Sequence, residues 1–428
     1  MLERAVRCQM DNGLTLLACP HQATEHVEVI LSLPAGTGLE SPGQAGLANF
    51  VARAVLLGSA ELDFDAYNEE LDSFGGSLSA GGQPDSAVWR GSCLAADLPR
   101  LLELLRSALV APAFAVDDVS RLRGQLLTGI DEREQDTMRL ARRVAQELAY
   151  GLDHAYGRPA NGYRTTVQTL GPPELQAFWQ AHYAPRGGIV AVVGPGDPGR
   201  LASMVESALA DWSAGGQQPG SVPEGTPPAL STNGGAQPGT RRDLTLPGKT
   251  QTDIAMVVPA LPRDHPDYEA LSLANLILGR LGLGGRLGQR VRERLGLAYY
   301  CYSSLVPGRG PGPWLLAAGV NPSKLVEALE NIEAELQRMR MEPVDADELT
   351  MAVGYARGSL IVQLEEPAGL LGMLHRLEYY QLGLGYVARY LGWLETVSAE
   401  RLREVVQRHL VAERIAVVTA GPPLAGQT

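Results

Sequence analysis

The sequence predicts an α+β fold of two similar halves, each an α/β sandwich in which an antiparallel-rich sheet packs on helices. Three observations support this. The 428 residues exceed the roughly 250–300 that one core serves. Residues 213–240 are rich in Gly and Pro, and the two flanking pieces share one plan. We therefore expect an N-terminal half at residues 1–212, a flexible linker at 213–242 and a C-terminal half at 243–428.

The linker is predicted from composition alone. Residues 213–240 consist almost wholly of Gly, Pro, Ser, Thr, Gln and Ala, with Glu224 as the single charged residue. Such a segment holds too few large apolar side chains to form a core, so it is expected to be flexible and to separate two folded halves.

The first half opens with an apolar strand at residues 27–33, and a helix is expected to follow at residues 44–57. It closes with a β-branched strand at residues 189–194, after an amphipathic helix.

The second half repeats this plan. It opens with a strand at residues 253–258, followed by a helix at residues 267–278 for which Asp264 or Asp267 is an available N-cap. It closes with a strand at residues 415–420. Because strands and helices are mixed rather than strictly alternating, a sheet against helices fits better than a doubly wound parallel sheet. The two halves therefore indicate a duplication of one architecture.

Bulk composition excludes several classes of protein. A net charge of −12 and a pI of about 5.2 argue against a broad nucleic-acid surface. The four cysteines form no C-x-x-C pair, which argues against a disulfide framework or a cysteine-based zinc site. No apolar run approaches the roughly 18 residues of a membrane span, and the N-terminus has no apolar signal stretch. We expect a cytoplasmic protein with no membrane partner.

Neither the glycine-rich segment nor the histidines of this chain match a nucleotide-binding or zinc-binding pattern. The glycine-rich residues 75–82 lack the Lys-Ser/Thr of a nucleotide-binding loop, and we interpret them as a loop before a strand within residues 85–95. The seven histidines include no pair within four residues of each other, so no helix presents two local zinc ligands. His154 and His182 are expected to be packing or hydrogen-bonding residues.

Three segments resemble the pitrilysin/insulinase family of zinc metallopeptidases, which includes mitochondrial processing peptidase. Residues 12–60 are similar to the opening hairpin, central strand and first helix of that family. Residues 154–197 resemble its "HPYGxPxxG" segment and the strand after it, and residues 274–303 its C-terminal "LGGxxSSRLxxxLREKxGLAYSVYS" block. The resemblance spans both halves and implies the same two-half fold.

The family's zinc motif is degenerate in this chain. Active members carry H-x-x-E-H on the first helix, whose spacing places two histidine ligands and a glutamate base on one helical face. Here Asn49 replaces the first histidine, Ala52 the base and Arg53 the second histidine. The third ligand, a glutamate about 75 residues further on, aligns with Gly129. We predict no zinc and no catalysis on this chain alone. The residues leave open whether this face is a vestigial pocket wall or a new partner contact.

One family feature is retained in the C-terminal half. In the family, an arginine and a tyrosine spaced like Arg292 and Tyr299 hold the substrate backbone and help to stabilise the tetrahedral intermediate. A guanidinium can donate forked hydrogen bonds to peptide carbonyls, and a phenol can donate to a developing oxyanion. The alternative is an arginine on a solvated helix face and an ordinary strand aromatic.

The resemblance implies the non-catalytic subunit of a heterodimeric zinc peptidase. A homologous partner would supply the zinc and the H-x-x-E-H motif, while this chain supplies a chamber wall and the pair Arg292 and Tyr299 for peptide substrates. No cofactor is expected on this chain. Two alternatives remain: a structural scaffold, or a peptide-binding homodimer without hydrolytic activity.

Overall fold

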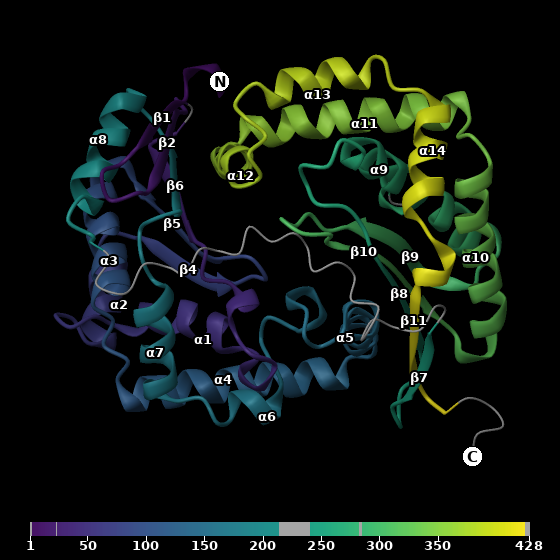
Figure 1. Ribbon diagram of the computed structural model, residues 1–428, viewed down its shortest axis with the longest axis horizontal. Coiled ribbons are helices and arrows are strands. Elements are labelled where there is room, and N and C mark those ends of the chain that lie inside the picture. Colours follow the sequence, from purple (N-terminus) through teal and green to yellow (C-terminus); the bar gives the residue numbers. More distant parts are fainter. Residues whose placement is uncertain (1, 23, 214–239, 282–284, 424–428) are drawn as a thin grey trace. The chain divides into compact units, whose positions relative to one another are not determined.

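The computed structural model describes residues 2–22, 24–213, 240–281 and 285–423 (Figure 1). The predicted linker therefore lies, for residues 214–239, outside the described residues. The chain divides into two compact units. The first unit comprises Met1–Ile130, Pro159–Gly225 and Ile361–Tyr386, and the second unit comprises Asp131–Arg158, Thr226–Leu360 and Val387–Thr428. Each unit thus takes one segment from the opposite half of the sequence, which differs from the two consecutive halves that we expected.

A six-stranded sheet forms the centre of the first unit, in the order β1-β2-β6-β3-β5-β4. Every neighbouring pair is antiparallel except β2 and β6. Its strands are β1 (Val6–Gln9), β2 (Thr15–Pro20), β3 (His26–Leu33), β4 (Ser77–Gly82), β5 (Ala87–Leu94) and β6 (Ile189–Gly194).

A five-stranded sheet forms the centre of the second unit, in the order β7-β11-β8-β10-β9. Only β7 and β11 are parallel. Its strands are β7 (Arg241–Thr245), β8 (Thr252–Pro259), β9 (Ala298–Leu305), β10 (Pro313–Val320) and β11 (Ala416–Gly421).

The two sheets repeat one topology. The order β2-β6-β3-β5-β4 in the first unit corresponds strand for strand to β7-β11-β8-β10-β9 in the second, and the single parallel pair lies at the same place in both. The prediction of an α+β fold with two similar, antiparallel-rich sheet-and-helix halves is confirmed. By this correspondence β4 and β9 are equivalent edge strands.

The following helices cover the sheets and connect their strands: α1 (Leu47–Ala54), α2 (Phe64–Ser73), α3 (Leu98–Val110), α4 (Val116–Gln135), α5 (Thr137–Tyr150), α6 (Arg164–Val167), α7 (Pro172–His182), α8 (Pro198–Leu209), α9 (Tyr268–Asn275), α10 (Leu325–Met341), α11 (Ala346–Glu365), α12 (Pro367–Tyr379), α13 (Tyr386–Leu394) and α14 (Ala399–His409).

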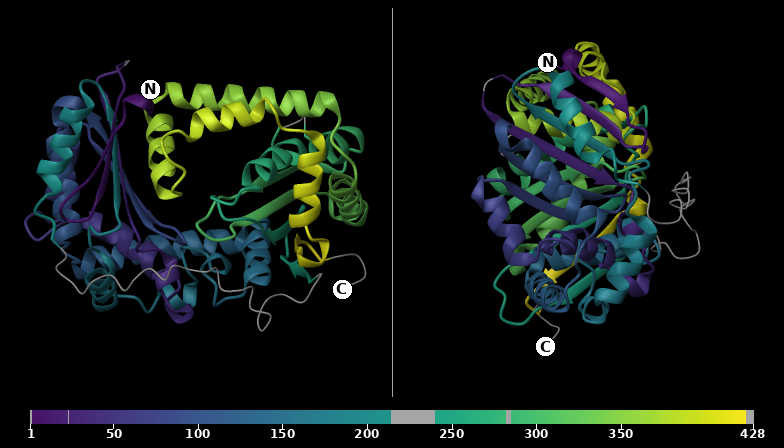
Figure 2. Two further views of the ribbon diagram at one scale, coloured as in Figure 1. Left: turned by 45° about the horizontal axis from the view of Figure 1, so that its top comes forward. Right: turned by 90° about the vertical axis from the view of Figure 1, so that its left-hand side faces the viewer.

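Helices cover both faces of the first sheet. Helices α3 and α8 lie along one face (Figure 2), where Leu31 and Leu33 of β3 join the core. On the opposite face, α12 packs against β3 and β6, and Ser32 contacts His375 of that helix. Because both faces are buried, β3 and β6 read as nearly continuous apolar runs rather than as alternating patterns.

The second sheet is covered in the same way. Ile254 and Met256 of β8 pack in one core with α9, α10 and α14, while Ala255 and Val257 pack in another with α5. Alternation along a strand sends neighbouring side chains to opposite faces, so β8 is buried throughout. The segments that cross between the halves of the sequence, carrying α5 and α12, are thus the ones that cover the second face of each sheet.

Helix α1 is shorter than the predicted helix at residues 44–57. A 3₁₀ turn, Pro42–Gln44, precedes it, and another, Val55–Leu57, follows it. The buried carboxylate of Glu40 accepts hydrogen bonds from the backbone N–H groups of Gly46 and Ala48, at 3.0 and 2.9 Å. A negative charge there satisfies helix donors that have no partner within the helix. Glu40 therefore sets where α1 begins.

The predicted helix at residues 267–278 is present as α9 and continues as a π-helical segment, Leu276–Arg280. A second π-helical segment, Gly288–Arg294, leads towards β9. Asp267 occupies the N-cap position of α9, but its side chain does not bond to the helix N–H groups. It binds cationic side chains instead, as described below.

The interpretation of residues 75–82 as a loop is wrong, because Ser77–Gly82 forms the edge strand β4. Glycine disfavours strands by propensity, but here it permits close packing. A Cβ atom at Gly82 would lie 2.7 Å from both the backbone N and the Cα of Asn49. The glycine therefore lets β4 lie directly against α1.

Within the part of the chain that the structure describes, no helix is both long enough and apolar enough to span a bilayer.

Candidate functional site

On the face of α1 that carries the degenerate motif, Asn49 links the helix to two other elements by side-chain hydrogen bonds. Asn49 is 4% exposed. Its Nδ2 donates to Oδ1 of Asn161 at 3.1 Å, and its Oδ1 accepts from the backbone N–H of Gly82 at 3.0 Å. The amide thus uses both its donor and its acceptor side to tie α1 to β4 and to the loop before α6.

Ala52 lies in the core, where its methyl group offers no ligand or base. Its backbone carbonyl accepts a hydrogen bond of 3.1 Å from Nε1 of Trp89, a fully buried ring. Gly129, the position aligned with the third ligand, is exposed on α4, and a Cβ atom built there would meet nothing within 4 Å. Neither residue can hold a metal ion through its side chain.

Arg53 is the one charged side chain on this face, and it is half-buried. Burial alone lowers the pKa of its guanidinium from the ordinary value. Among the described residues, no carboxylate forms an ion pair with it and no group accepts a hydrogen bond from it. The position of the second family histidine is therefore held by a cation that has no counterion among the described residues.

These residues do not fit a catalytic zinc ion. Such a site needs about three protein ligands and an open position. Asn49 is committed to two protein partners, Ala52 has no donor atom, and Arg53 carries a fixed positive charge that would repel the metal. No step of zinc chemistry can be derived for this face.

Arg292 lies in the second unit, near the end of the π-helical segment Gly288–Arg294. The segment ends where the N–H of Gly296 donates to the carbonyl of Arg292 at 3.1 Å, with Gly296 in the left-handed region at φ +59°. The guanidinium is exposed, and its Nε lies 3.5 Å from Oε1 of the equally exposed Glu293. Such a surface pair is weak, so Arg292 can exchange it for another acceptor.

Tyr299 lies on the edge strand β9, and a bulge sets its direction. Tyr300 pairs with Gly319 and Ala298 pairs with Val320, which leaves Tyr299 as the extra residue. A bulge re-aims the side chain of the extra residue and is common at sheet edges and beside functional sites. Tyr299 is 80% exposed, far more than a strand tyrosine that packs on a sheet.

The next residue on β9 is fixed firmly beneath this bulge. The hydroxyl of Tyr300 donates a short hydrogen bond to the buried carboxylate of Asp253, which also accepts from Thr137 and from Gln251. Burial, together with this carboxylate, raises the pKa of Tyr300 well above its ordinary value. Tyr300 thus anchors β9, while its neighbour Tyr299 projects outwards.

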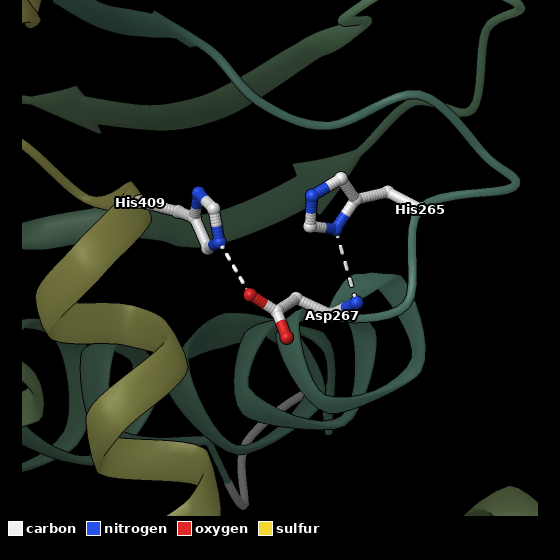
Figure 3. Close-up of side chains that lie close together, drawn as sticks. All are labelled: His265, Asp267 and His409. Carbon is white, nitrogen blue, oxygen red and sulfur yellow. Dashed lines mark hydrogen bonds and ion pairs between the residues drawn. The ribbon is translucent and has the colours of Figure 1, made fainter.

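The structure also brings together a cluster that the sequence did not reveal: His265, Asp267 and His409 (Figure 3). Their potential ligand atoms all lie within 4.8 Å of one another. Nε2 of His409 bonds to Oδ2 of Asp267 at 2.8 Å, and the N–H of Asp267 donates to Nδ1 of His265 at 3.0 Å. The histidines are far apart in sequence, so no ligand spacing could have indicated them.

Electrostatics argue against a metal ion at this cluster. Arg401 and Arg408 donate to the two carboxylate oxygens of Asp267, at 2.5 and 2.7 Å. Burial alone would raise the pKa of Asp267, but the hydrogen bonds from His409 and Arg401 outweigh it and lower the pKa to about 2. With two arginines around one carboxylate, a divalent cation would meet net positive charge. The cluster is an ion-pair network that ties α14 to the start of α9.

The two histidines assigned to packing have that role. Nδ1 of His154 accepts from the N–H of Tyr156 at 3.1 Å, and its ring stacks on Tyr150. His182 packs against Phe178 with ring centroids 4.5 Å apart, and burial lowers the pKa of its imidazole.

Comparison with known families accounts for this architecture. The profile of the insulinase family, peptidase family M16, matches residues 16–156, and that of the peptidase M16 inactive domain matches residues 169–354. An uncharacterized zinc protease of Mycobacterium tuberculosis is 25% identical over 416 residues, covering 97% of this chain and 93% of the relative. The mitochondrial-processing peptidase subunit beta of Pongo abelii is 22% identical over 430 residues, covering 98% of this chain and 85% of that subunit.

Solved structures show the same fold over the full length. A peptidase M16 inactive domain from Pseudomonas fluorescens superposes with a TM-score of 0.87 at 23% identity, covering 98% of both chains. A protease from Helicobacter pylori superposes with a TM-score of 0.86 at 18% identity, covering 98% of this chain and 99% of the other. The chain therefore belongs to the insulinase family, peptidase family M16, and it is peptidase-like in fold while its H-x-x-E-H positions read Asn-Phe-Val-Ala-Arg.

Proposed function

We propose that this chain is the non-catalytic subunit of a heteromeric zinc peptidase, in which it binds peptide substrates through Arg292 and Tyr299 while a homologous partner carries the zinc ion. The observation that carries the proposal is the contrast between the degenerate zinc-motif face of α1 and the exposed Tyr299 on β9. The α1 face has no zinc ligand or base, whereas Tyr299 is re-aimed by a bulge and 80% exposed.

The exposure of Arg292 and Tyr299 suits a role in binding. A large aromatic side chain left in water has an apolar surface that a partner or substrate can bury. The guanidinium of Arg292 holds only an exposed contact of 3.5 Å with Glu293, so its remaining N–H groups are available to peptide carbonyls. The hydroxyl of Tyr299 can donate to a carbonyl or to an oxyanion that develops on it.

Edge strands supply the second argument for a peptide as ligand. Among the described strands, β4 and β9 each have one neighbour in their sheet. An edge strand can pair with an extended peptide by backbone hydrogen bonds that do not depend on peptide sequence. Tyr299 lies on such an edge, so a peptide paired with β9 would lie within reach of its side chain.

The relatives support the division of labour. Several of them are named zinc proteases, and one is named as a subunit of mitochondrial processing peptidase. A family in which chains act as subunits can place zinc chemistry on one chain and substrate contacts on another. Zinc is accordingly proposed for the partner and not for this chain.

The test measures peptide hydrolysis by a homologous H-x-x-E-H chain from the same cell, alone and mixed with this chain. We expect this chain to have no activity alone and to raise the turnover of the homologue. Arg292→Ala and Tyr299→Phe should each lose ten-fold or more of the enhancement, on the scale of one lost transition-state donor. Arg294→Ala, which removes an exposed arginine from the same segment, should retain it.

Two outcomes would contradict the proposal. Hydrolysis by this chain alone, with bound zinc, would mean that the alignment of Asn49, Ala52 and Arg53 is wrong. Enhancement that survives both Arg292→Ala and Tyr299→Phe would leave the chain a scaffold, with no role for these side chains.

A further inference from the structure

Arg53 carries a positive charge that no described residue neutralises. The elements that pack most closely on α1 are β4, β5, α7 and the turns Thr37–Leu39 and Val55–Leu57. In the described chain these elements contain one carboxylate, that of Glu174. Its Oε2 accepts from the N–H of Gly171 at 2.9 Å, so it caps the first turn of α7.

The nearby acidic residue on the other side of α1 is also committed. Glu40 binds the N–H groups of Gly46 and Ala48, at the opposite end of the helix from Arg53. A half-buried cation without an anion or acceptor is unfavourable, because it loses hydration without a compensating partner. Burial accordingly lowers the pKa of Arg53, with no opposing charge to raise it.

The neighbours of Arg53 form a fixed wall rather than a competing ligand. Asn49 lies one turn earlier on the same helical face, and its amide already binds Gly82 and Asn161. The side chain between them on that face is the methyl group of Ala52. Among the described residues, the guanidinium of Arg53 is therefore the charged group on this face that has neither an ion pair nor a hydrogen-bond acceptor.

We propose that the Asn49–Arg53 face of α1 is a carboxylate-binding subsite, at which Arg53 binds an acidic group of a peptide. The inference deepens the proposed function and rests on it, because it names the class of peptide that the chain prefers. A guanidinium pairs with a carboxylate through two parallel hydrogen bonds, which are stronger than bonds between neutral groups. Helix α1 also packs against the edge strand β4, beside which an extended peptide can lie. The carboxylate belongs either to the C-terminus of the peptide or to an Asp or Glu side chain.

The experiment measures binding of labelled ten-residue peptides to the full chain by fluorescence anisotropy. One peptide has a free C-terminal carboxylate and no acidic side chain, and its partner is amidated. A second amidated pair differs only in a central Glu or Gln. We expect at least one carboxylate member to bind ten-fold or more tightly than its neutral partner, and the identity of that pair assigns the source of the carboxylate.

Variants then assign the preference to Arg53. In Arg53→Gln, the two members of the preferred pair should bind equally, while Arg53→Lys should retain part of the preference, because a lysine keeps the charge without the bidentate geometry. Arg4→Gln, which removes an exposed arginine from the same unit, should behave like the natural protein. Melting temperatures of all variants test whether they fold.

The outcomes separate this inference from the proposed function. If peptides bind but neither carboxylate is preferred, or if the preference persists in Arg53→Gln, water alone solvates Arg53 and the inference is overturned while peptide binding stands. If the natural chain binds no peptide of either pair, both proposals are overturned.

Discussion

Replacing Asn49 by Ala tests whether the two side-chain hydrogen bonds of Asn49, on the face of α1 with the degenerate zinc motif, stabilise the fold. The substitution removes the hydrogen bond to Asn161 at 3.1 Å and the one from the N–H of Gly82 at 3.0 Å. It leaves the helix propensity of α1 intact or improved, because alanine is the better helix former. Any loss of stability must therefore come from the two lost bonds and the space left behind.

The expected magnitude follows from the environment of the two partners. An unsatisfied buried donor or acceptor costs about 1–3 kcal/mol. Gly82 is only partly buried and Asn161 is exposed, so water can replace part of each bond. We expect about 1 kcal/mol for each bond and about 2 kcal/mol together. For a unit of about 200 residues, this lowers Tm by about 4–8 °C.

The assay is thermal unfolding by circular dichroism or calorimetry. Asn68→Ala is the matched control, because among the described residues the Asn68 amide bonds only to the carbonyl of Phe64 within its own helix α2. That variant should lie within about 0.5 kcal/mol of the natural protein. If Asn49→Ala also melts within about 1 °C of the natural protein, the two hydrogen bonds of Asn49 contribute no stability and the reasoning is refuted.

Three further changes test other parts of the structure. Glu40→Gln should lower the free energy of unfolding by about 1.5–3 kcal/mol in a urea titration, because the buried carboxylate receives two charge-assisted bonds from α1; an unchanged midpoint would contradict this. Asp267 has a folded-state pKa of about 2, below its unfolded value, so its contribution is complete above about pH 4 and is lost as pH falls towards 2. With partial screening by solvent this amounts to about 1–2 kcal/mol, and Asp267→Asn should flatten the stability profile between pH 5 and 2.5. Tyr299→Ala should change the free energy of unfolding by less than about 0.5 kcal/mol, because the side chain is 80% exposed; a larger loss would indicate a structural role.

The strands that organise both sheets were predictable from local pattern. β3, β6, β8 and β11 are runs of branched apolar residues, and each lies within about one residue of its predicted range. The edge strand β4 was missed because its glycines oppose strand propensity, whereas close contact with Asn49 requires them. Tertiary packing against α1, rather than local strand propensity, therefore determines that β4 is a strand.

The exchange of α5 and α12 between the units was not predictable from pattern. An amphipathic helix shows that it covers a sheet, but its sequence does not say which sheet. The helix that covers the second face of each sheet lies in the other half of the sequence. Which helix packs on which sheet, when the two are far apart in the sequence, is decided by the topology of the whole chain and not by the local pattern.

Some features of the candidate site could likewise be predicted from the sequence, and others depend on the folded structure. Loss of the zinc ligands could be read from residue types at known helical spacing, since chemistry alone excludes Ala52 and Arg53 as ligands. The exposure of Tyr299 could not, because it depends on a bulge in the pairing of β9 with β10. Nor could the network at Asp267, whose partners come from α14.

The most direct test of the central claim is the zinc content and peptide hydrolysis of the purified chain, alone and mixed with an H-x-x-E-H relative. We expect no zinc and no turnover for the chain alone, and an enhancement of the relative that Arg292→Ala lowers ten-fold or more. Stoichiometric zinc with turnover in the single chain would contradict it.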